Sequence, residues 1–271
     1  MEKLLNVGCG TKIHPDWVNI DMVSYSPKVK VVNLLKGIPF PDNFFDVVYH
    51  SQVLEHIPKE KAAAFIKECH RVLKPNGILR VVVPDLEDIV NEYKKTLNEN
   101  LENPTEKSKS NYDWIMLELL DQMTRHYNGG LMATYLQQPK IVNEEYVMSR
   151  MGYVGRNFKK GNLKMALSSV TMFRKAVRFV LHKGFSKLFW SKATDVGNFR
   201  LGGEVHLWMY DRYSLAQLLS SCGFTEIAIK NPVESEIPEW QKYELDVKDG
   251  IVYDPTSLFM EAKKCKPNTL G

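Results

Sequence analysis

Long apolar runs are missing from this chain of 271 residues, and none approaches the length of about 18 that identifies a membrane-spanning helix. A secretory leader is also missing ahead of the first apolar run, which begins at residue 3. We therefore expect a cytoplasmic protein, and any membrane association to be peripheral, at the inner surface.

Cysteine is scarce and scattered. The chain has four cysteines, Cys9, Cys69, Cys222 and Cys265, and no two of them form a Cys-X-X-Cys pair. This spacing excludes a recognisable zinc or disulfide framework and favours reduced thiols. We expect no bound metal.

Acidic residues are absent between Glu145 and Asp195, whereas eleven lysines and arginines lie from Arg150 to Lys192. Such a segment is typical of a surface that faces anions, although a basic face is often only solvated surface. Three anions fit it: a nucleotide-sugar or phosphorylated glycan, an anionic lipid surface, or RNA. Nucleic acid is disfavoured, because the chain shows no RNA-binding module and its pI is only about 8.7.

Five apolar, β-branched or aromatic runs occur in the first third of the chain, at residues 3–7, 16–21, 28–35, 44–51 and 78–85. Their nearly continuous hydrophobicity predicts buried parallel strands. Between the last two runs, apolar residues recur at helical spacing from Ala62 to Leu73. Near the other end, 210–224 predicts a helix that Asp211 caps and Gly223 ends, and 225–231 and 257–264 predict two closing strands.

The strand and helix rhythm is interrupted at residues 86–200. This stretch begins as a helix, passes through a polar linker and becomes helical again at 113–127. A further apolar helical face is expected within 161–190, but Arg174 interrupts it, so we do not interpret it as a membrane-surface helix. The glycine-rich segment 126–139 is either a mobile lid or structural filler. We predict one α/β domain over 1–271, a Rossmann-like doubly wound sheet, with 86–200 as a helical insertion or lid.

A Gly-X-Gly turn follows the first predicted strand, and Asp21 ends the second. Glycine lets the backbone approach a ligand closely, and an acid at the tip of the next strand can accept both hydroxyls of a ribose. The alternative is an ordinary tight turn with Asp21 in a loop. A dinucleotide site would need a third glycine and a following helix, but Thr11, Lys12 and Ile13 follow Gly10, which speaks against NAD.

These motifs together resemble the class I S-adenosylmethionine-dependent methyltransferases. The run "LLNVGCG" is similar to their first motif, "NID" to their ribose-binding acid, "IPFPDNFFDVVYHSQVLEHIP" to their fourth-strand region and "RVLKPNGILRVVVPD" to their fifth. The resemblance is strong over residues 3–85 and loose over 86–200. More narrowly, the chain resembles a small branch associated with bacterial surface-polysaccharide pathways. That implies methylation of a small-molecule, sugar or lipid-linked glycan acceptor.

The resemblance also implies roles for residues at the strand ends. Gly8 and Gly10 would contact the methionine part of S-adenosylmethionine. Asp21 would contact the ribose and Asn33 the adenine. Tyr49, His50 and Ser51, at the end of the fourth strand, would lie beneath the sulfonium. Asn6 and Asn33 stand where the family often has acids. The residues implied to bind the cofactor are Asn6, Gly8, Gly10, Asp21, Asn33, Leu34, His50 and Ser51.

Methyl transfer to a hydroxyl also needs a group that removes its proton. His206 precedes the closing helix, and histidine titrates near neutral pH; its alternative role is a loop histidine bonded to backbone. Asp85 ends the fifth strand, where such sheets contact ligands, but it fits equally as the cap of the helix that follows. Both are candidate catalytic residues.

Glu55 and His56 raise the question of a metal, because some relatives have Glu-X-X-Glu-His there. Gln52 occupies the first of those positions, which removes one anionic ligand. We therefore expect His56 to pack near the site without binding metal.

Two other functions stay open beside O-methylation of a sugar. One is an NAD-dependent oxidoreductase on the same sheet. The other is a noncatalytic partner of a membrane-associated glycan-assembly complex, docking through the basic segment at 150–192.

Overall fold

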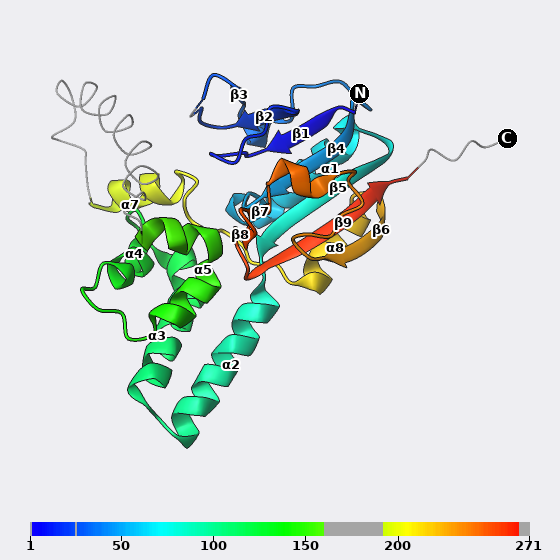
Figure 1. Cartoon of the computed structure of the whole chain (residues 1–271). Coiled ribbons are helices and arrows are strands. Elements are labelled where there is room, and N and C mark those ends of the chain that lie inside the picture. The colour runs from blue at the N-terminus through cyan, green and yellow to red at the C-terminus, as the bar shows by residue number, and fades with distance from the viewer. Residues whose placement is uncertain (1, 25, 160–191, 266–271) are drawn as a thin grey trace, which may run out of the picture. The chain divides into compact units, whose positions relative to one another are not determined.

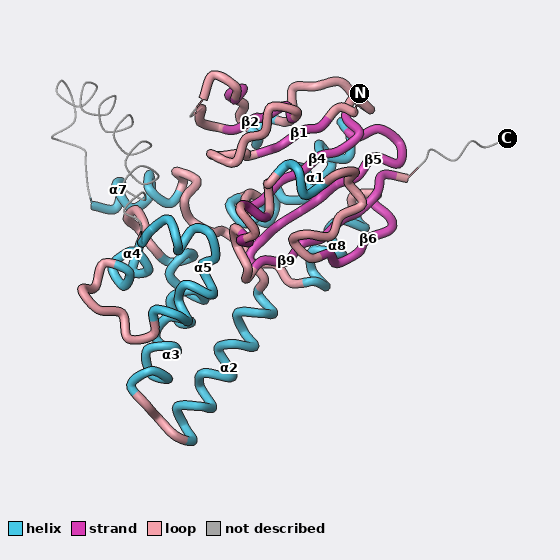
Figure 2. The backbone as a smooth tube through the Cα atoms, viewed as in Figure 1, coloured by secondary structure: helices cyan, strands magenta, loops and turns pink. Residues whose placement is uncertain are grey.

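The computed structural model describes residues 2–24, 26–159 and 192–265. The chain divides into two compact units: Met1–Asp88 with Leu207–Gly271 forms the first, and Ile89–His206 the second. Figure 2 shows that strands lie in the first unit and that the described part of the second is built from helices and loops. This division does not test whether the chain is a single domain or whether residues 86–200 are an insertion within it, so both stay predictions.

A seven-stranded sheet organises the first unit, in the order β3-β2-β1-β4-β5-β9-β6. Strand β9 pairs antiparallel with both β5 and β6, whereas the pairs among β1 to β5 are all parallel. This is the predicted α/β doubly wound arrangement, mostly parallel with an antiparallel last strand (Figure 1). The strands are β1 (Leu4–Val7), β2 (Trp17–Asp21), β3 (Val29–Val31), β4 (Phe45–Ser51), β5 (Leu73–Pro84), β6 (Phe224–Lys230) and β9 (Ser257–Lys264).

Helices α1 (Lys59–Val72) and α8 (Arg212–Ser221) pack on one face of this sheet. The predicted apolar stripe of α1 is buried against the strands, with Phe65 and Ile66 nearly inaccessible. Helix α8 buries Leu215 and Leu219 in the same core. Side chains at helical spacing thus form one continuous apolar layer with the inward side chains of the strands.

The opposite face of the sheet is covered by the segment between β6 and β9, which the sequence does not predict. It contains the 3₁₀ helix η3 (Trp240–Tyr243) and the short strands β7 (Val247–Lys248) and β8 (Ile251–Val252). Trp240 and Tyr243 pack there on Trp17 and Tyr49, forming a second buried cluster. Trp17 is therefore a core residue.

A fully buried guanidinium ties this covering segment to the sheet. Arg80 on β5 donates to Asp246 at 2.8 Å and to Glu261 on β9 at 2.6 Å, and the carbonyl oxygens of Asn231 and Glu234 accept its remaining hydrogen bonds. Arg80 and its four partners all lie in the first unit. Because each donor has an acceptor, the buried charge is compensated.

The second unit holds the helices of the predicted insertion. They are α3 (Glu106–Thr124), α4 (Gly130–Leu136), α5 (Glu144–Lys159, kinked at Gly152), α7 (Lys192–Arg200) and most of α2 (Leu86–Glu102). Helix α3 begins seven residues earlier than the expected 113, because Thr105 and Ser108 form a capping box. The segment 126–139 includes α4, whose amino end is held by the Asp121 carboxylate.

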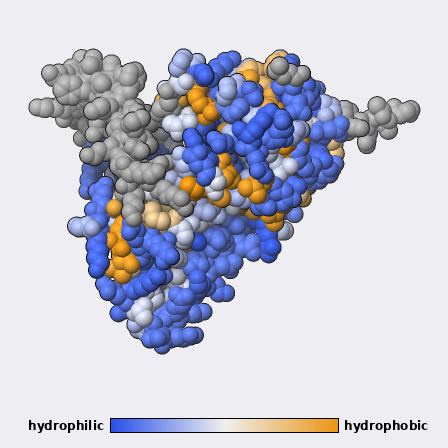
Figure 3. All heavy atoms as spheres, in the orientation of Figure 1, coloured by the Kyte–Doolittle hydropathy of each residue, from blue (hydrophilic) through white to orange (hydrophobic). Residues whose placement is uncertain are grey.

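Two expectations from the sequence fall on residues that the structure does not describe. The apolar helical face expected within 161–190 and most of the basic segment at 150–192 lie outside the described residues. In the described ranges, every helix is too short or too polar to cross a membrane. Figure 3 shows a largely hydrophilic face on which apolar residues form small, separate groups.

Candidate functional site

The glycine turn after β1 has the backbone conformation that the motif predicts. Gly8 and Gly10 have φ angles of +64° and +51°, in the left-handed region that glycine adopts without strain. A Cβ atom on Gly8 would lie 2.3 Å from a methyl carbon of Val53, so packing also requires glycine there. A Cβ atom on Gly10 would meet no described atom within 4 Å. The turn is therefore packed at Gly8 and open at Gly10.

Asp21 closes on this turn from the end of β2. Its Oδ2 accepts the Gly10 N–H at 2.8 Å, and its Oδ1 accepts the Val23 N–H at 3.0 Å. The side chain is half-buried. Since each carboxylate oxygen has a second lone pair, both can still accept from a diol. The structure thus brings Gly10 and Asp21 together as the sequence predicts.

The predicted asparagines make local hydrogen bonds. Asn6 is buried, and its amide donates to the Lys12 carbonyl oxygen at 2.7 Å and to Asn19 Oδ1 at 3.1 Å, which fixes the loop after the glycine turn. Asn33 is exposed and accepts the Leu35 N–H as the cap of η1 (Leu34–Lys36). Leu34 packs in the core. Their contacts with a cofactor remain predictions.

The end of β4 sends successive side chains to opposite faces of the sheet, as strand geometry requires. The Tyr49 hydroxyl donates to Asp246 at 2.6 Å, within the cluster around Arg80 and away from the α1 face. His50 is fully buried against Phe65 on that face, and burial lowers its pKa to about 3. Ser51 accepts a hydrogen bond from Lys12 Nζ. Of the three side chains, Ser51 is thus the one bonded to the loop after β1.

The order of the strands reverses direction between β1 and β4. From β1 the chain proceeds outward through β2 and β3, then returns to add β4 on the other side. In open α/β sheets, ligands bind at such a switch point, outside the carboxyl ends of the strands. Gly8 follows β1 directly and Ser51 ends β4, so the glycine turn lies at this position.

The two candidate catalytic residues lie in different units. Asp85 Oδ1 accepts the Glu87 N–H at 2.9 Å, so Asp85 caps the start of α2, and burial raises its pKa. His206 is the last residue of the second unit, and its N–H donates to the Gln122 carbonyl oxygen. The cap is therefore an observed role for Asp85, while a catalytic role for either residue stays a prediction.

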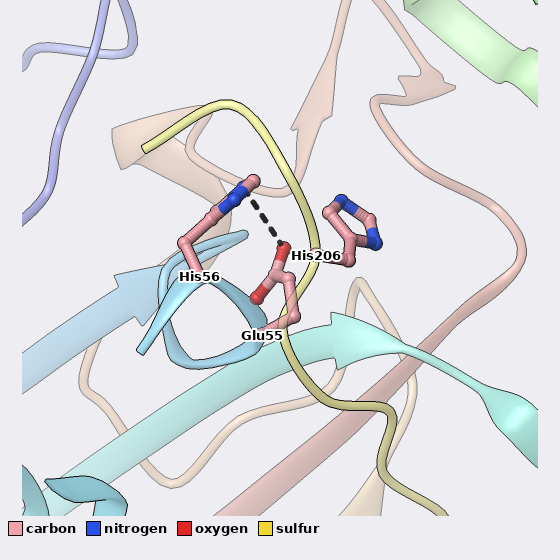
Figure 4. A group of neighbouring side chains, drawn as sticks. All are labelled: Glu55, His56 and His206. Carbon is pink, nitrogen blue, oxygen red and sulfur yellow. Dashed lines mark ion pairs between the residues drawn. The ribbon is translucent and has the colours of Figure 1, made fainter. Parts of the chain in front are cut away.

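Glu55, on the 3₁₀ helix η2 (Leu54–His56), was considered from sequence only as a metal ligand. It is completely buried, and neither carboxyl oxygen accepts a hydrogen bond from the described residues. His56 Nε2 lies 3.8 Å from Glu55 Oε1 (Figure 4). Burial raises the Glu55 pKa to about 8, so the carboxyl group is mainly protonated at neutral pH and the contact falls short of a full ion pair.

Lys12 lies beside the glycine turn and was not singled out from the sequence. Its Nζ lies 3.1 Å from Ser51 Oγ and 3.4 Å from Asp254 Oδ2, and the side chain is only 20% exposed. A lysine two residues after a glycine turn usually extends into solvent. The available signal was a cation in the loop expected to meet the ligand.

Residues 5–81 of the chain match a family model described as a methyltransferase domain. A probable S-adenosylmethionine-dependent methyltransferase of Mycobacterium tuberculosis is 42% identical over 60 residues, which cover 22% of this chain and 21% of that protein. An uncharacterized protein of Haemophilus influenzae is 34% identical over 151 residues, 53% of this chain and 58% of that protein. The chain thus spans about a fifth of the length of the curated methyltransferase it matches.

Among solved structures, the chain is similar to a SAM-dependent methyltransferase from Archaeoglobus fulgidus, at 12% identity and a TM-score of 0.39 over 97% of this chain and 86% of that one. A second, from Methanosarcina mazei, has 16% identity and a TM-score of 0.42 over 98% and 93%. TM-scores this low carry no argument about the fold, which rests on the strand order of the sheet. For the segment that matches in sequence, the expected enzyme class, a methyltransferase that uses S-adenosylmethionine, is confirmed.

Proposed function

We propose that the whole chain is an S-adenosylmethionine-dependent methyltransferase and that its acceptor is an oxygen of a sugar in a polysaccharide pathway. The observation that carries the cofactor assignment is the glycine turn closed by Asp21 at the switch point of the sheet. Gly10 leaves open space beside the backbone, and Asp21 keeps lone pairs for a ribose diol.

S-adenosylmethionine, when bound, would supply a methyl group on a positively charged sulfur: an acceptor oxygen in line with the C–S bond would bond to the methyl carbon, and the C–S bond would break with its electron pair left on sulfur. The protein's task is to hold the two molecules in that alignment and to take the proton from the acceptor. In the proposed arrangement, Gly8 and Gly10 contact the amino-acid part and Asp21 holds the ribose. His206 and Asp85 stay the candidate proton acceptors.

Calorimetric titration of the full chain with S-adenosylmethionine, S-adenosylhomocysteine and NAD tests the cofactor. We expect saturable binding of the first two and none of NAD. Asp21→Ala should weaken binding by roughly tenfold or more, because hydrogen bonds to a charged group are lost. Asp21→Asn keeps an acceptor for only one of the two backbone N–H groups, of Gly10 and Val23, so a loss of affinity in this variant is assigned to the ligand contact only if thermal melts show an unchanged fold.

Asp16→Ala is the matched control for these variants. Asp16 directly precedes β2, the strand that Asp21 ends, but its side chain is more than half exposed, at 57%. This variant should bind like the wild type. Saturable NAD binding, or wild-type affinity in Asp21→Ala, would refute the cofactor assignment.

The sugar acceptor is supported by the family resemblance alone. It is tested by incubating the protein with S-adenosylmethionine radiolabelled in its methyl group and a panel of candidate acceptors. The panel holds nucleotide sugars, lipid-linked sugars, imidazole-containing amines and RNA. Label transferred to a sugar oxygen supports the proposal. Transfer only to an amine or to RNA contradicts it.

The second candidate function is a noncatalytic partner that docks on an anionic membrane through the basic segment at 150–192. The observation that favours it is the eleven basic residues with no acid among them. It predicts salt-sensitive flotation with vesicles containing anionic lipid and no methyl transfer to any acceptor. Turnover with a sugar would exclude the noncatalytic version.

A further inference from the structure

We propose that Lys12 binds the carboxylate of the cofactor's amino-acid part, an assignment that rests on the proposed function. Lys12 lies two residues beyond Gly10, in the loop that leaves β1. Its ammonium group reaches the end of β4, where Nζ donates to Ser51 Oγ at 3.1 Å. It therefore spans the strands that flank the switch point.

The backbone at Lys12 is fixed from both sides. Its N–H donates to the Cys9 carbonyl oxygen at 2.9 Å, and its own carbonyl oxygen accepts the buried Asn6 amide at 2.7 Å. Asn6 is in turn bonded to Asn19 on β2. The position from which the lysine side chain starts is thus set by the core of the sheet. This gives the buried Asn6 amide a role in placing Lys12.

The direction in which a bound cofactor extends follows from the strand order. Asp21, the proposed ribose contact, ends β2, and Asn33, the expected adenine contact, follows β3. A ligand held at these two points must extend its other end over β1 toward β4, since the order is β3-β2-β1-β4. That end is the amino acid, and Lys12 Nζ with Ser51 Oγ occupies the place it reaches.

Lys12 already holds one carboxylate there. Asp254 Oδ2 lies 3.4 Å from Nζ, and the ring of Tyr253 lies 4.8 Å from it. An ammonium has three donors, so it can bind a second carboxylate beside Ser51 and Asp254. The Lys12 and Asp254 side chains are 20% and 28% exposed, which leaves the pair accessible from solvent while shielding it in part. A charge-assisted hydrogen bond in such surroundings is stronger than one at the open surface.

The test compares two ligands that differ by the carboxylate alone, S-adenosylmethionine and its decarboxylated form, on the full chain and on Lys12→Met. The wild type should bind the first more tightly. Lys12→Met should weaken S-adenosylmethionine roughly ten- to a hundredfold, because a hydrogen bond to a charged group is lost, and leave the decarboxylated form unchanged or tighter.

Lys74→Met is the matched control, since Lys74 also pairs with an aspartate, Asp46 at 2.7 Å, but at the amino end of β5. It should bind both ligands like the wild type, and thermal melts should show all variants folded. An equal loss of both ligands, or no loss, in Lys12→Met overturns the Lys12 assignment alone. Wild-type protein that binds neither ligand overturns the proposed function and the assignment with it.

Discussion

The carboxyl group of Glu55 is fully buried, and its oxygens accept no hydrogen bond from the described residues. Burial, the largest cause, raises its pKa from 4.5 to about 8, and Asp254 adds to the rise while Lys12 opposes it. The folded chain therefore holds this proton more tightly than the unfolded chain. The stabilisation is complete below pH 4.5 and is lost as the pH rises toward 8.

Glu55→Gln should remove this pH dependence. Between pH 6.5 and 8 the wild type should lose about 2 kcal/mol of unfolding free energy through this group, at about 1.4 kcal/mol per pH unit, and the variant should not. His50, whose pKa falls from 6.5 to about 3, affects stability mainly below pH 6.5, because its folded form resists protonation there. Urea unfolding at several pH values measures the difference.

The control for this series is Glu60→Gln, which changes an exposed acid in the first turn of α1. Its stability should follow the wild-type profile at every pH. Parallel curves for Glu55→Gln and the wild type would show that Glu55 does not hold its proton in the folded chain.

At the scale of the element, α8 begins at a capping box. Asp211 Oδ1 accepts the Ser214 N–H at 2.7 Å, and Ser214 Oγ accepts the Asp211 N–H at 3.1 Å. The hydrogen bond that the carboxylate accepts from the Ser214 N–H is the largest cause that lowers the Asp211 pKa. The helix ends at Ser221, followed by Gly223 at a φ of +92°. Both boundary residues are those that the sequence predicts.

Asp211→Ala should lower the unfolding free energy by about 1 kcal/mol, the usual cost of losing a helix cap. Chemical unfolding followed by circular dichroism measures it. Asp211→Asn still accepts the Ser214 N–H and should retain most of the stability. Equal losses in the two variants would point to the charge of Asp211, and not to its hydrogen bond, as the stabilising factor.

The elements that sequence predicts well are those with a strong local pattern. Strands β1, β2, β4 and β9 and helices α1 and α8 follow apolar runs, helical spacing or caps, which act over a few neighbouring residues. The expected strand at 28–35 is shorter, β3 ending at Val31, because Asn33 caps the 3₁₀ helix η1 instead of continuing the strand.

The features missed from sequence depend on partners far along the chain. Arg80 looks like an ordinary charge within a strand, but its acceptors Asp246 and Glu261 lie 166 and 181 residues away. Lys12 likewise meets Asp254 at a separation of 242 residues. Gly10 and Asp21, only 11 residues apart on adjacent strands, were predictable because their meeting follows from the motif and the strand order. Long-range pairing of single charges has no such local signal.

At the scale of the whole molecule, the second unit has a core of its own. Trp114 on α3 is fully buried with Leu136 and Val147. Its indole N–H donates to Glu118, which the Arg150 side chain also binds, at 2.7 Å. The proposed cofactor contacts lie in the first unit. Stability and cofactor binding should therefore be separable between the units.

Trp114→Phe should destabilise the second unit by about 1–3 kcal/mol, because it leaves a void and removes a buried hydrogen bond. The affinity for S-adenosylmethionine should not change. Hydrogen exchange resolved by peptide measures the first effect and calorimetric titration the second. A substantial fall in affinity would show that the second unit supports the cofactor site.

The position of β9 has a consequence for how the chain matures. β9 follows the other strands of the sheet in sequence, yet it lies between β5 and β6 and pairs with both. During synthesis on the ribosome, β5 and β6 must emerge with exposed, unpaired edges, and such edges invite pairing with other nascent chains. Arg80 would meanwhile lack its Glu261 counter-ion. A chaperone that covers these edges until residues 257–264 leave the exit tunnel should raise the yield of folded protein.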